Sequence, residues 1–278
     1  MSCVAVTGAT GFIGQEVSAL FRRQGADVIE LSRSGGKGGS MRWALGQDLP
    51  EACRTAETIV HLASATLSET GSLQAAIDRD VDGTRVILRQ VRTWRQAGGR
   101  CRFIFVSSQS ANPDAANAYG RSKWAIEQLV DHDDDIVVRP GLVYSEMPSS
   151  VFATFDKLSR MPILPVINHR PVIQPIHVRE VARCIAELAR MDQPPRMVKI
   201  GAAEPLTFRD AMRATARRAG RRAPLMVPIP MRPVKLMAHL VDRLFHLTIT
   251  ERLDGLAGLQ PLDTKASLAA LGQALDPY

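Results

Sequence analysis

The sequence predicts an α/β protein built on a doubly wound parallel sheet, with a small, mostly helical C-terminal lobe. Short apolar runs alternate with helical periodicity over the first half of the 278-residue chain, which is typical of parallel strands joined by helices. The runs are apolar throughout, as expected of strands that are covered on both faces. A glycine-rich turn, TGATGFIG at residues 7–14, follows the first run.

The expected elements follow in chain order. The helix after the glycine turn carries four large apolar residues on one face, which are Ile13, Val17, Leu20 and Phe21. A long helix is expected near 73–97 and a shorter one over 117–128. The expected strands are CVAVTG, ADVIELS, MRWAL, ETIVHLAS, CRFIFVSS and IVVRPGLVY, and the chain returns to the sheet through IQPIHV and RMVKIG.

Prolines and a break in the pattern after residue 145 indicate an excursion from the sheet. We expect a dinucleotide-binding domain from 1–145 and 176–204, and a substrate-binding lobe from 146–175 and 205–278. Within 233–247 apolar residues recur at helical spacing, and core packing is the main interpretation, with membrane-surface contact as the alternative. These residues are Val234, Met237, Val241, Leu244 and Phe245.

Composition narrows the class of protein. The hydrophobic fraction of 45% and the charged fraction of 23% suit a globular chain, and no uncharged apolar run is long enough to span a bilayer. The chain begins without the basic and apolar regions of a signal peptide, so we expect a cytoplasmic protein. The four cysteines and six histidines lack ligand spacing, and we expect no disulfide framework and no metal.

The formal net charge is +7, and much of the basic excess lies in 209–222. Arg209, Arg213 and Arg217 form a stripe at helical spacing. A solvated helix face is the main interpretation, while phosphate, nucleic acid or a membrane surface are alternative partners. No nucleic-acid motif accompanies the stripe, so we expect no nucleic-acid partner.

The glycine turn has the spacing of a dinucleotide-binding loop. Gly8 permits the turn, Gly11 lets the backbone approach a pyrophosphate at the helix N-terminus, and Gly14 permits close packing of helix on strand. Because a strand precedes the loop and an amphipathic helix follows it, we expect this segment to bind a dinucleotide.

The end of the second predicted strand indicates which dinucleotide is bound. An acidic residue there would accept hydrogen bonds from the adenosine ribose, but the strand ends in Ser32 and Arg33. A guanidinium suits a 2′-phosphate, so NADP is expected, with NAD as the alternative. Glu30 lies two residues earlier and is a poor candidate for the ribose.

Tyr119 and Lys123 lie one helical turn apart in NAYGRSKWAIEQ, so both side chains project from one face. A phenol becomes a usable acid or base when a nearby cation stabilises its phenolate. The spacing alone also fits a tyrosine and a lysine on a helix surface.

Taken in order, the motifs resemble the extended branch of the short-chain dehydrogenase/reductase superfamily, known as the NAD-dependent epimerase/dehydratase family. The resemblance covers most of residues 1–200. It rests on TGATGFIG, the pair Asp48 and Leu49, HLAS at 61–64, FIFVSS at 103–108, YGRSK at 119–123, RPGLVY at 139–144 and IHVREVA at 176–182.

The resemblance implies a Rossmann fold and a set of site residues. Tyr119 would exchange a proton with the substrate, Lys123 would stabilise its phenolate and hold the nicotinamide ribose, and Ser108 would bind the reacting oxygen. The implied substrate region comprises 64–66, 139–143 and 152–169. The implied cofactor contacts are Gly8, Thr10, Gly11, Phe12, Ile13, Gly14, Ser32, Arg33, Ser34, Asp48, Leu49, Leu62, Ala63, Ser64, Val106, Tyr119, Lys123, Pro140, Gly141 and Val143.

Several positions depart from the family pattern. Gln109 and Ser110 stand where dehydratases carry acidic residues, which disfavours dehydration. Asp80 replaces a common asparagine, and Ser145 replaces the glycine that usually follows VY. Beyond residue 200 the chain looks like a branch related to the accessory nucleotide-binding subunit of respiratory complex I, whose members commonly lack an intact Tyr/Lys pair.

We therefore expect an NADP-preferring oxidoreductase that acts on a carbonyl or secondary alcohol, with a nucleotide sugar as one substrate class. The alternatives are an epimerase of the same fold and a non-catalytic nucleotide-binding assembly or sensor protein. The expected partner is a small-molecule substrate, without stable membrane insertion, and a homodimer through the long helices is usual for similar proteins.

Overall fold

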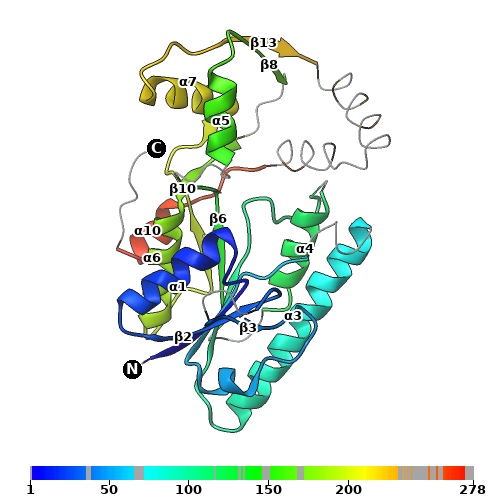
Figure 1. The fold of residues 1–278 in the computed structure, drawn as a ribbon, viewed down its shortest axis with the longest axis vertical. Coiled ribbons are helices and arrows are strands. Elements are labelled where there is room, and N and C mark those ends of the chain that lie inside the picture. The colour runs from blue at the N-terminus through cyan, green and yellow to red at the C-terminus, as the bar shows by residue number, and fades with distance from the viewer. Residues whose placement is uncertain are drawn as a thin grey trace.

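The computed structural model contains a seven-stranded parallel sheet with helices on both faces (Figure 1). It describes residues 2–35, 39–65, 72–115, 117–130, 133, 135–145, 151–167, 172–230, 234, 236, 239, 250, 255 and 259–272. Apart from Val234, the apolar stripe predicted within 233–247 lies outside these residues.

The strand order is β11-β6-β5-β4-β1-β2-β3. The strands are β1 (Cys3–Thr7), β2 (Asp27–Ser32), β3 (Met41–Arg42), β4 (Thr58–His61), β5 (Arg102–Val106), β6 (Asp135–Pro140) and β11 (Met197–Ile200). Because β2 and β4 lie on opposite sides of β1, the order reverses there, and the reversal leaves a crevice at the carboxyl ends of these strands. The doubly wound parallel sheet predicted from the apolar runs is confirmed.

Each face of the sheet is buried by its own helices (Figure 1). Helices α1 (Phe12–Arg23) and α6 (Val178–Arg190) pack together on one face, over a core that includes Val17, Phe21 and Ile185. Helices α3 (Leu73–Gln96) and α4 (Ala118–Glu127) cover the other face, over Ile87 and Phe103 among others. Burial on both faces explains why the strands have no polar side in the sequence.

A separate small core lies above the sheet (Figure 1). Here α5 (Val151–Ser159) and α7 (Phe208–Arg218) pack on β8 (Ile163–Ile167) and β13 (Leu225–Ile229), which pair in parallel. Two further short pairings lie near it, formed by β7 (Leu142–Tyr144) with β10 (Pro175–His177) and by β9 (Val172–Ile173) with β12 (Leu206–Thr207). The remaining elements are η2 (Glu51–Thr55) and α10 (Lys265–Ala270).

The predicted strand over MRWAL is shorter than expected. Only Met41 and Arg42 pair with β2, while Trp43 is buried and its backbone N–H donates to the carbonyl of Ser32. The indole N–H of Trp43 donates to the carbonyls of Gln47 and Asp48. Trp43 closes the loop that follows β3. The chain therefore leaves the edge of the sheet after two paired residues.

Candidate active site

The turn after β1 requires its glycines. Gly8 has φ +70°, in the left-handed region, and a Cβ there would lie 2.9 Å from the backbone nitrogen of Ala63. A Cβ at Gly14 would overlap the carbonyl oxygen of Gly8 and lie 2.8 Å from Cα of Ala9. Gly11 is the N-cap of α1, and no side chain caps this helix. The helix therefore begins with backbone N–H groups that suit a phosphate.

A cavity of about 360 Å³ opens beside this turn. It lies at the carboxyl ends of β1, β2 and β4, at the reversal of strand order. Eight of the residues predicted to bind the cofactor line it, which are Gly8, Thr10, Gly11, Ser32, Arg33, Leu62, Ala63 and Ser64. Ala65, expected in the substrate region, also lines it, and sequence reasoning missed the other four, which are Leu31, Trp43, Leu45 and Arg79.

Asp48 and Leu49, which the resemblance implied as an adenine contact, are not among the residues that line the cavity. Leu49 is buried in the core, and its backbone N–H and carbonyl both bond to the side-chain amide of Gln90, at 2.7 and 3.0 Å. Asp48 is exposed, and its carbonyl accepts from the Trp43 indole. Trp43 therefore brings this segment to the cavity.

The other predicted cofactor residues lie around the carboxyl ends of the same strands or of their neighbours. Phe12, Ile13 and Gly14 form the first turn of α1, and Ser34 follows β2. Val106 and Pro140 end β5 and β6, and Gly141 and Val143 follow. A Cβ at Gly141 would overlap the carbonyl oxygen of Gln174, so this glycine permits close packing against the segment that precedes β10.

Helix α4 holds the predicted catalytic pair. It begins at Asn117, whose side-chain oxygen accepts from the backbone N–H of Gly120 at 3.1 Å. Tyr119 is 46% exposed, whereas Lys123 is only 3% exposed. The ammonium of Lys123 donates to the carbonyl of Val106 at 3.2 Å, and it lies 5.6 Å from the ring centroid of Tyr119. The helix thus places a buried cation beside an accessible phenol, and the two side chains share one face, as their one-turn spacing predicted.

Ser108 lies two residues beyond the end of β5, whose last carbonyl, that of Val106, accepts from Lys123. Its hydroxyl lies 3.0 Å from that of Ser110 and accepts from the Ser110 backbone N–H at 3.2 Å. The side-chain amide of Gln109, between them, donates instead to the carbonyls of Val172 and Gln260. Gln109 therefore joins the end of β5 to the lobe.

Asp80 on α3 connects the two halves of the site. Its buried carboxylate accepts hydrogen bonds from the hydroxyls of Ser64 and Ser122, at 2.8 and 2.9 Å, and from the backbone N–H of Ala65. Ser64 and Ala65 line the cavity, and Ser122 precedes Lys123 in α4. All three donors suit a carboxylate, so Asp80 positions the cavity wall relative to α4.

His61 is buried beneath the site at the end of β4. Its Nδ1 and Nε2 lie 2.7 Å from the Thr7 hydroxyl and 3.1 Å from the Thr84 hydroxyl. Burial away from water, and secondarily the charge of Lys123, lower the pKa of His61 from 6.5 to about 3. His61 is therefore uncharged at neutral pH.

An ion pair that sequence reasoning missed joins α4 to the sheet. Glu127, at the end of α4, accepts from Nε of Arg139 at 2.7 Å and from its Nη2, and the hydroxyl of Ser107 also donates to Glu127. The side chains of Glu127 and Arg139 are 2% and 19% exposed. Arg139 was expected near the substrate, but its guanidinium is engaged here. The pair holds β5, β6 and α4 together next to Ser108.

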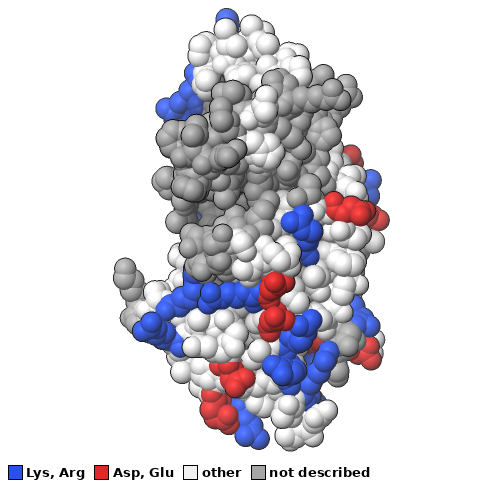
Figure 2. Space-filling view, turned by 90° about the vertical axis from the view of Figure 1, so that its right-hand side faces the viewer, with Lys and Arg blue, Asp and Glu red and all other residues white. Residues whose placement is uncertain are grey.

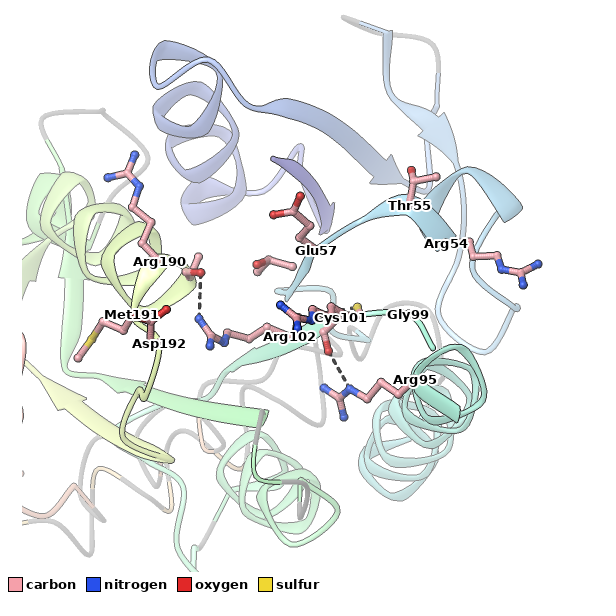
Figure 3. A pocket seen from close by; sticks show the side chains of 13 residues that line it. Arg54, Thr55, Glu57, Arg95, Gly99, Cys101, Arg102, Arg190, Met191 and Asp192 are labelled. Carbon is pink, nitrogen blue, oxygen red and sulfur yellow. Dashed lines mark hydrogen bonds between the residues drawn. The ribbon is translucent and has the colours of Figure 1, made fainter. Parts of the chain in front are cut away.

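A larger hollow of about 990 Å³ lies at the amino-terminal ends of the strands, where β4 and β5 begin (Figure 3). Arg102 donates to the carbonyls of Leu188 and Ala189 at the end of α6, and Arg95 donates to the carbonyl of Cys101. None of the predicted site residues lines this hollow. Ligands of doubly wound sheets bind at the carboxyl ends of the strands, so the cavity beside the glycine turn is the candidate site.

Within the described residues, no three His, Cys, Asp or Glu side chains are placed to hold a metal ion. No helix in the same part of the chain is long and apolar enough to cross a membrane. The four cysteines are free thiols.

Known proteins resemble this chain in sequence and in fold. A curated relative, the ceramide reductase of Caulobacter vibrioides (strain NA1000 / CB15N), is 27% identical over 280 residues, which span 93% of this chain and 83% of the relative. Among solved structures, the UDP-glucose 4-epimerase of Thermotoga maritima superposes with a TM-score of 0.71 at 18% identity, over 99% of this chain and 93% of that one. The UDP-N-acetylglucosamine 4-epimerase of Bacillus cereus gives 0.66 at 19% identity, over 84% and 87%.

At these identities the solved structures establish the fold alone. The model of the NAD dependent epimerase/dehydratase family matches residues 4–201, which include the glycine turn, the cavity wall and the Tyr119 helix. The chain belongs to the NAD-dependent epimerase/dehydratase family.

Proposed function

We propose that this protein is an NAD(P)-dependent oxidoreductase that interconverts a carbonyl and a secondary alcohol. The observation that carries the proposal is the buried ammonium of Lys123 beside the exposed phenol of Tyr119. Both lie at the carboxyl ends of the strands, where the glycine turn also lies. The chain's residues fit a dinucleotide, because the uncapped α1 N-terminus suits a pyrophosphate and the 360 Å³ cavity suits the adenosine half.

A bound nicotinamide would supply the hydride in the direction of reduction. The hydroxyl of Tyr119 then donates a proton to the carbonyl oxygen, which becomes the alcohol, and Lys123 stabilises the resulting phenolate. Ser108 donates a hydrogen bond to the same oxygen and holds it in reach of Tyr119. Oxidation runs through the same groups in reverse, with Tyr119 taking the proton.

We propose NADP as the preferred cofactor. Arg33 and Arg79 both line the cavity, and no Asp or Glu is among its lining residues. Glu30, the nearest carboxylate on β2, binds Arg22 of α1 at 2.8 Å, so it is engaged away from the ribose. Two guanidinium groups without a competing carboxylate favour a 2′-phosphate.

For the substrate we propose a long-chain lipid that carries a ketone or secondary hydroxyl. The relative that is 27% identical over 93% of this chain is named a ceramide reductase, whereas the nucleotide-sugar enzymes share only the fold. An epimerase remains the second candidate, because structural neighbours carry out that reaction on the same scaffold. A non-catalytic nucleotide-binding protein is the third.

Replacement of Tyr119 by Phe separates the two enzyme candidates from the non-catalytic one. Removal of one acid/base group lowers kcat by about 10²–10⁴-fold, and we expect this loss with an unchanged dissociation constant for NADPH. Tyr144→Phe is the matched control, since it also removes one hydroxyl and keeps the ring that packs edge-on against His177.

The cofactor that the purified protein releases on denaturation provides a second test, read by mass spectrometry. Little retained cofactor and preferential binding of added NADPH support an exchanging reductase. Tightly retained NAD would favour the epimerase. Full biological function in Tyr119→Phe, with loss of function in Gly11→Asp, would identify a non-catalytic nucleotide-binding protein.

A further inference from the structure

The outer face of the β8–β13 sheet is apolar and exposed. In the parallel register, Leu225 lies beside Ile163 and Val227 beside Pro165, so these four side chains share one face. Leu225 is 65% exposed, Ile163 54% and Val227 41%, and Met161, just before β8, is 42% exposed. We call Met161, Ile163, Pro165, Leu225 and Val227 the apolar face.

The opposite face of the same two strands is buried. Leu164 and Val166 alternate with the exposed residues of β8 and pack against Phe155 of α5 and Met212 of α7. The lobe has its core on that side, so the apolar face is not needed to complete it. Exposed apolar residues that gather on one face commonly mark a contact with a membrane or a protein.

Arginines flank the strands of this face in the sequence. Arg160 directly precedes Met161, and Arg222 precedes β13 by three residues. In 151–167 and 206–230 together there are eight basic residues and two acidic ones, a net of +6. The basic residues are Lys157, Arg160, Arg209, Arg213, Arg217, Arg218, Arg221 and Arg222.

Both acidic residues of these segments are engaged by arginines. Asp156 pairs with Arg160 and Arg221, and Asp210 pairs with Arg213. The upper end of the molecule in Figure 2, which is the end that carries β8 and β13 in Figure 1, shows blue and uncharged described side chains without red ones, whereas both signs occur below.

We propose that the apolar face docks on the surface of a bilayer that contains anionic lipids. The apolar side chains would enter the boundary between headgroups and acyl chains, while Arg160 and Arg222 meet lipid phosphates. The α7 stripe of Arg209, Arg213 and Arg217 adds attraction at a distance. A stable protein interface engages about 20–30 residues a side, far more than the five residues of this face, so a membrane fits better than a second copy.

The test is sedimentation of the full-length protein with sucrose-loaded vesicles, made of phosphatidylcholine alone or with phosphatidylglycerol. Binding is expected only to the mixed vesicles, and it should weaken as salt rises. Leu225→Ser with Val227→Ser should lower the partition coefficient at least about tenfold, because apolar burial is lost. Arg160→Gln with Arg222→Gln should lower it about fivefold for each arginine.

Matched variants elsewhere on the surface serve as controls. Met41→Ser with Met197→Ser removes two exposed apolar side chains, at 40% and 38%, and Arg54→Gln with Arg190→Gln removes two exposed arginines. Both should bind as wild type does. Thermal unfolding and NADPH binding verify that each variant is folded.

The proposal is overturned if the protein does not bind mixed vesicles, or if control and test variants lose binding equally. It is also overturned if light scattering shows a dimer that Leu225→Ser with Val227→Ser converts to a monomer, because a second copy would then cover the face. None of these outcomes depends on the reaction proposed above, which the Tyr119→Phe kinetics test separately.

Discussion

Replacement of Glu127 by Gln should destabilise the protein strongly, although Glu127 contacts neither the cavity nor Tyr119. Its carboxylate accepts from Ser107 and twice from Arg139, and its side chain is 2% exposed. Glutamine keeps the shape, but its one carbonyl oxygen cannot satisfy all three donors, and its NH₂ group would face another donor.

The size of the effect follows from the burial of the partner. Removal of one member of a buried ion pair typically costs 3–5 kcal/mol, because the other charge is left unpaired. The Arg139 side chain keeps 19% exposure, so water can solvate part of it. We therefore expect the low end, a loss of about 3 kcal/mol in the free energy of unfolding.

Urea unfolding at neutral pH measures this loss, and Asp82→Asn is the matched control. The Asp82–Arg85 pair is 68% and 52% exposed, so its disruption should cost less than about 0.5 kcal/mol. Adding Arg139→Met to Glu127→Gln should recover part of the stability, since no charge is left buried. A loss below about 1 kcal/mol for Glu127→Gln, or strict additivity in the double variant, would refute the reasoning.

Three other predictions follow from the site. Gly14→Ala should abolish dinucleotide binding in titrations, because its Cβ would overlap the Gly8 carbonyl oxygen. Gly46→Ala is the control, since Gly46 has φ +97° with open space around it, and it should only lower the free energy of unfolding by about 1 kcal/mol. Equal dinucleotide binding by both variants would contradict the role of the glycine turn. The pKa of His61 is lowered from 6.5 to about 3 in the folded protein. Between these pH values the unfolded chain binds a proton that the folded protein does not, so the free energy of unfolding should fall by up to about 1.4 kcal/mol per pH unit as the pH drops. His61→Gln should flatten that slope in urea titrations, and an unchanged slope would assign it to other groups. Arg33→Ser should weaken NADPH binding roughly 10- to 100-fold and leave NADH binding unchanged, and an equal loss for both would remove Arg33 from the 2′-phosphate.

The sheet and the glycine turn were predictable because each depends on local pattern. A buried parallel strand needs an apolar run, and the turn needs glycine where a side chain would collide. The one-turn spacing of Tyr119 and Lys123 likewise fixed their common face. The spacing did not predict how deeply each side chain is buried, because the burial of Lys123 depends on its contact with the Val106 carbonyl of β5.

Contacts between distant segments were not predictable from local pattern. Arg79 and Trp43 reach the cavity through the packing of α3 and the turn of the chain after β3. The pairing of Glu127 with Arg139 joins a helix to a strand, and the sequence indicated Arg139 only as a residue near the substrate. The resemblance named Asp48 and Leu49 instead, but the backbone of Leu49 is already bonded to Gln90.

The most direct test of the proposed chemistry is the transfer of deuterium to a long-chain ketone from NADPH that carries deuterium at both C4 positions of the nicotinamide. Purified protein should yield a secondary alcohol with one deuterium on the carbinol carbon, and Tyr119→Phe should slow this transfer by at least about 10². An unlabelled product, or equal rates for the two proteins, would contradict the roles that we propose for Tyr119 and Lys123.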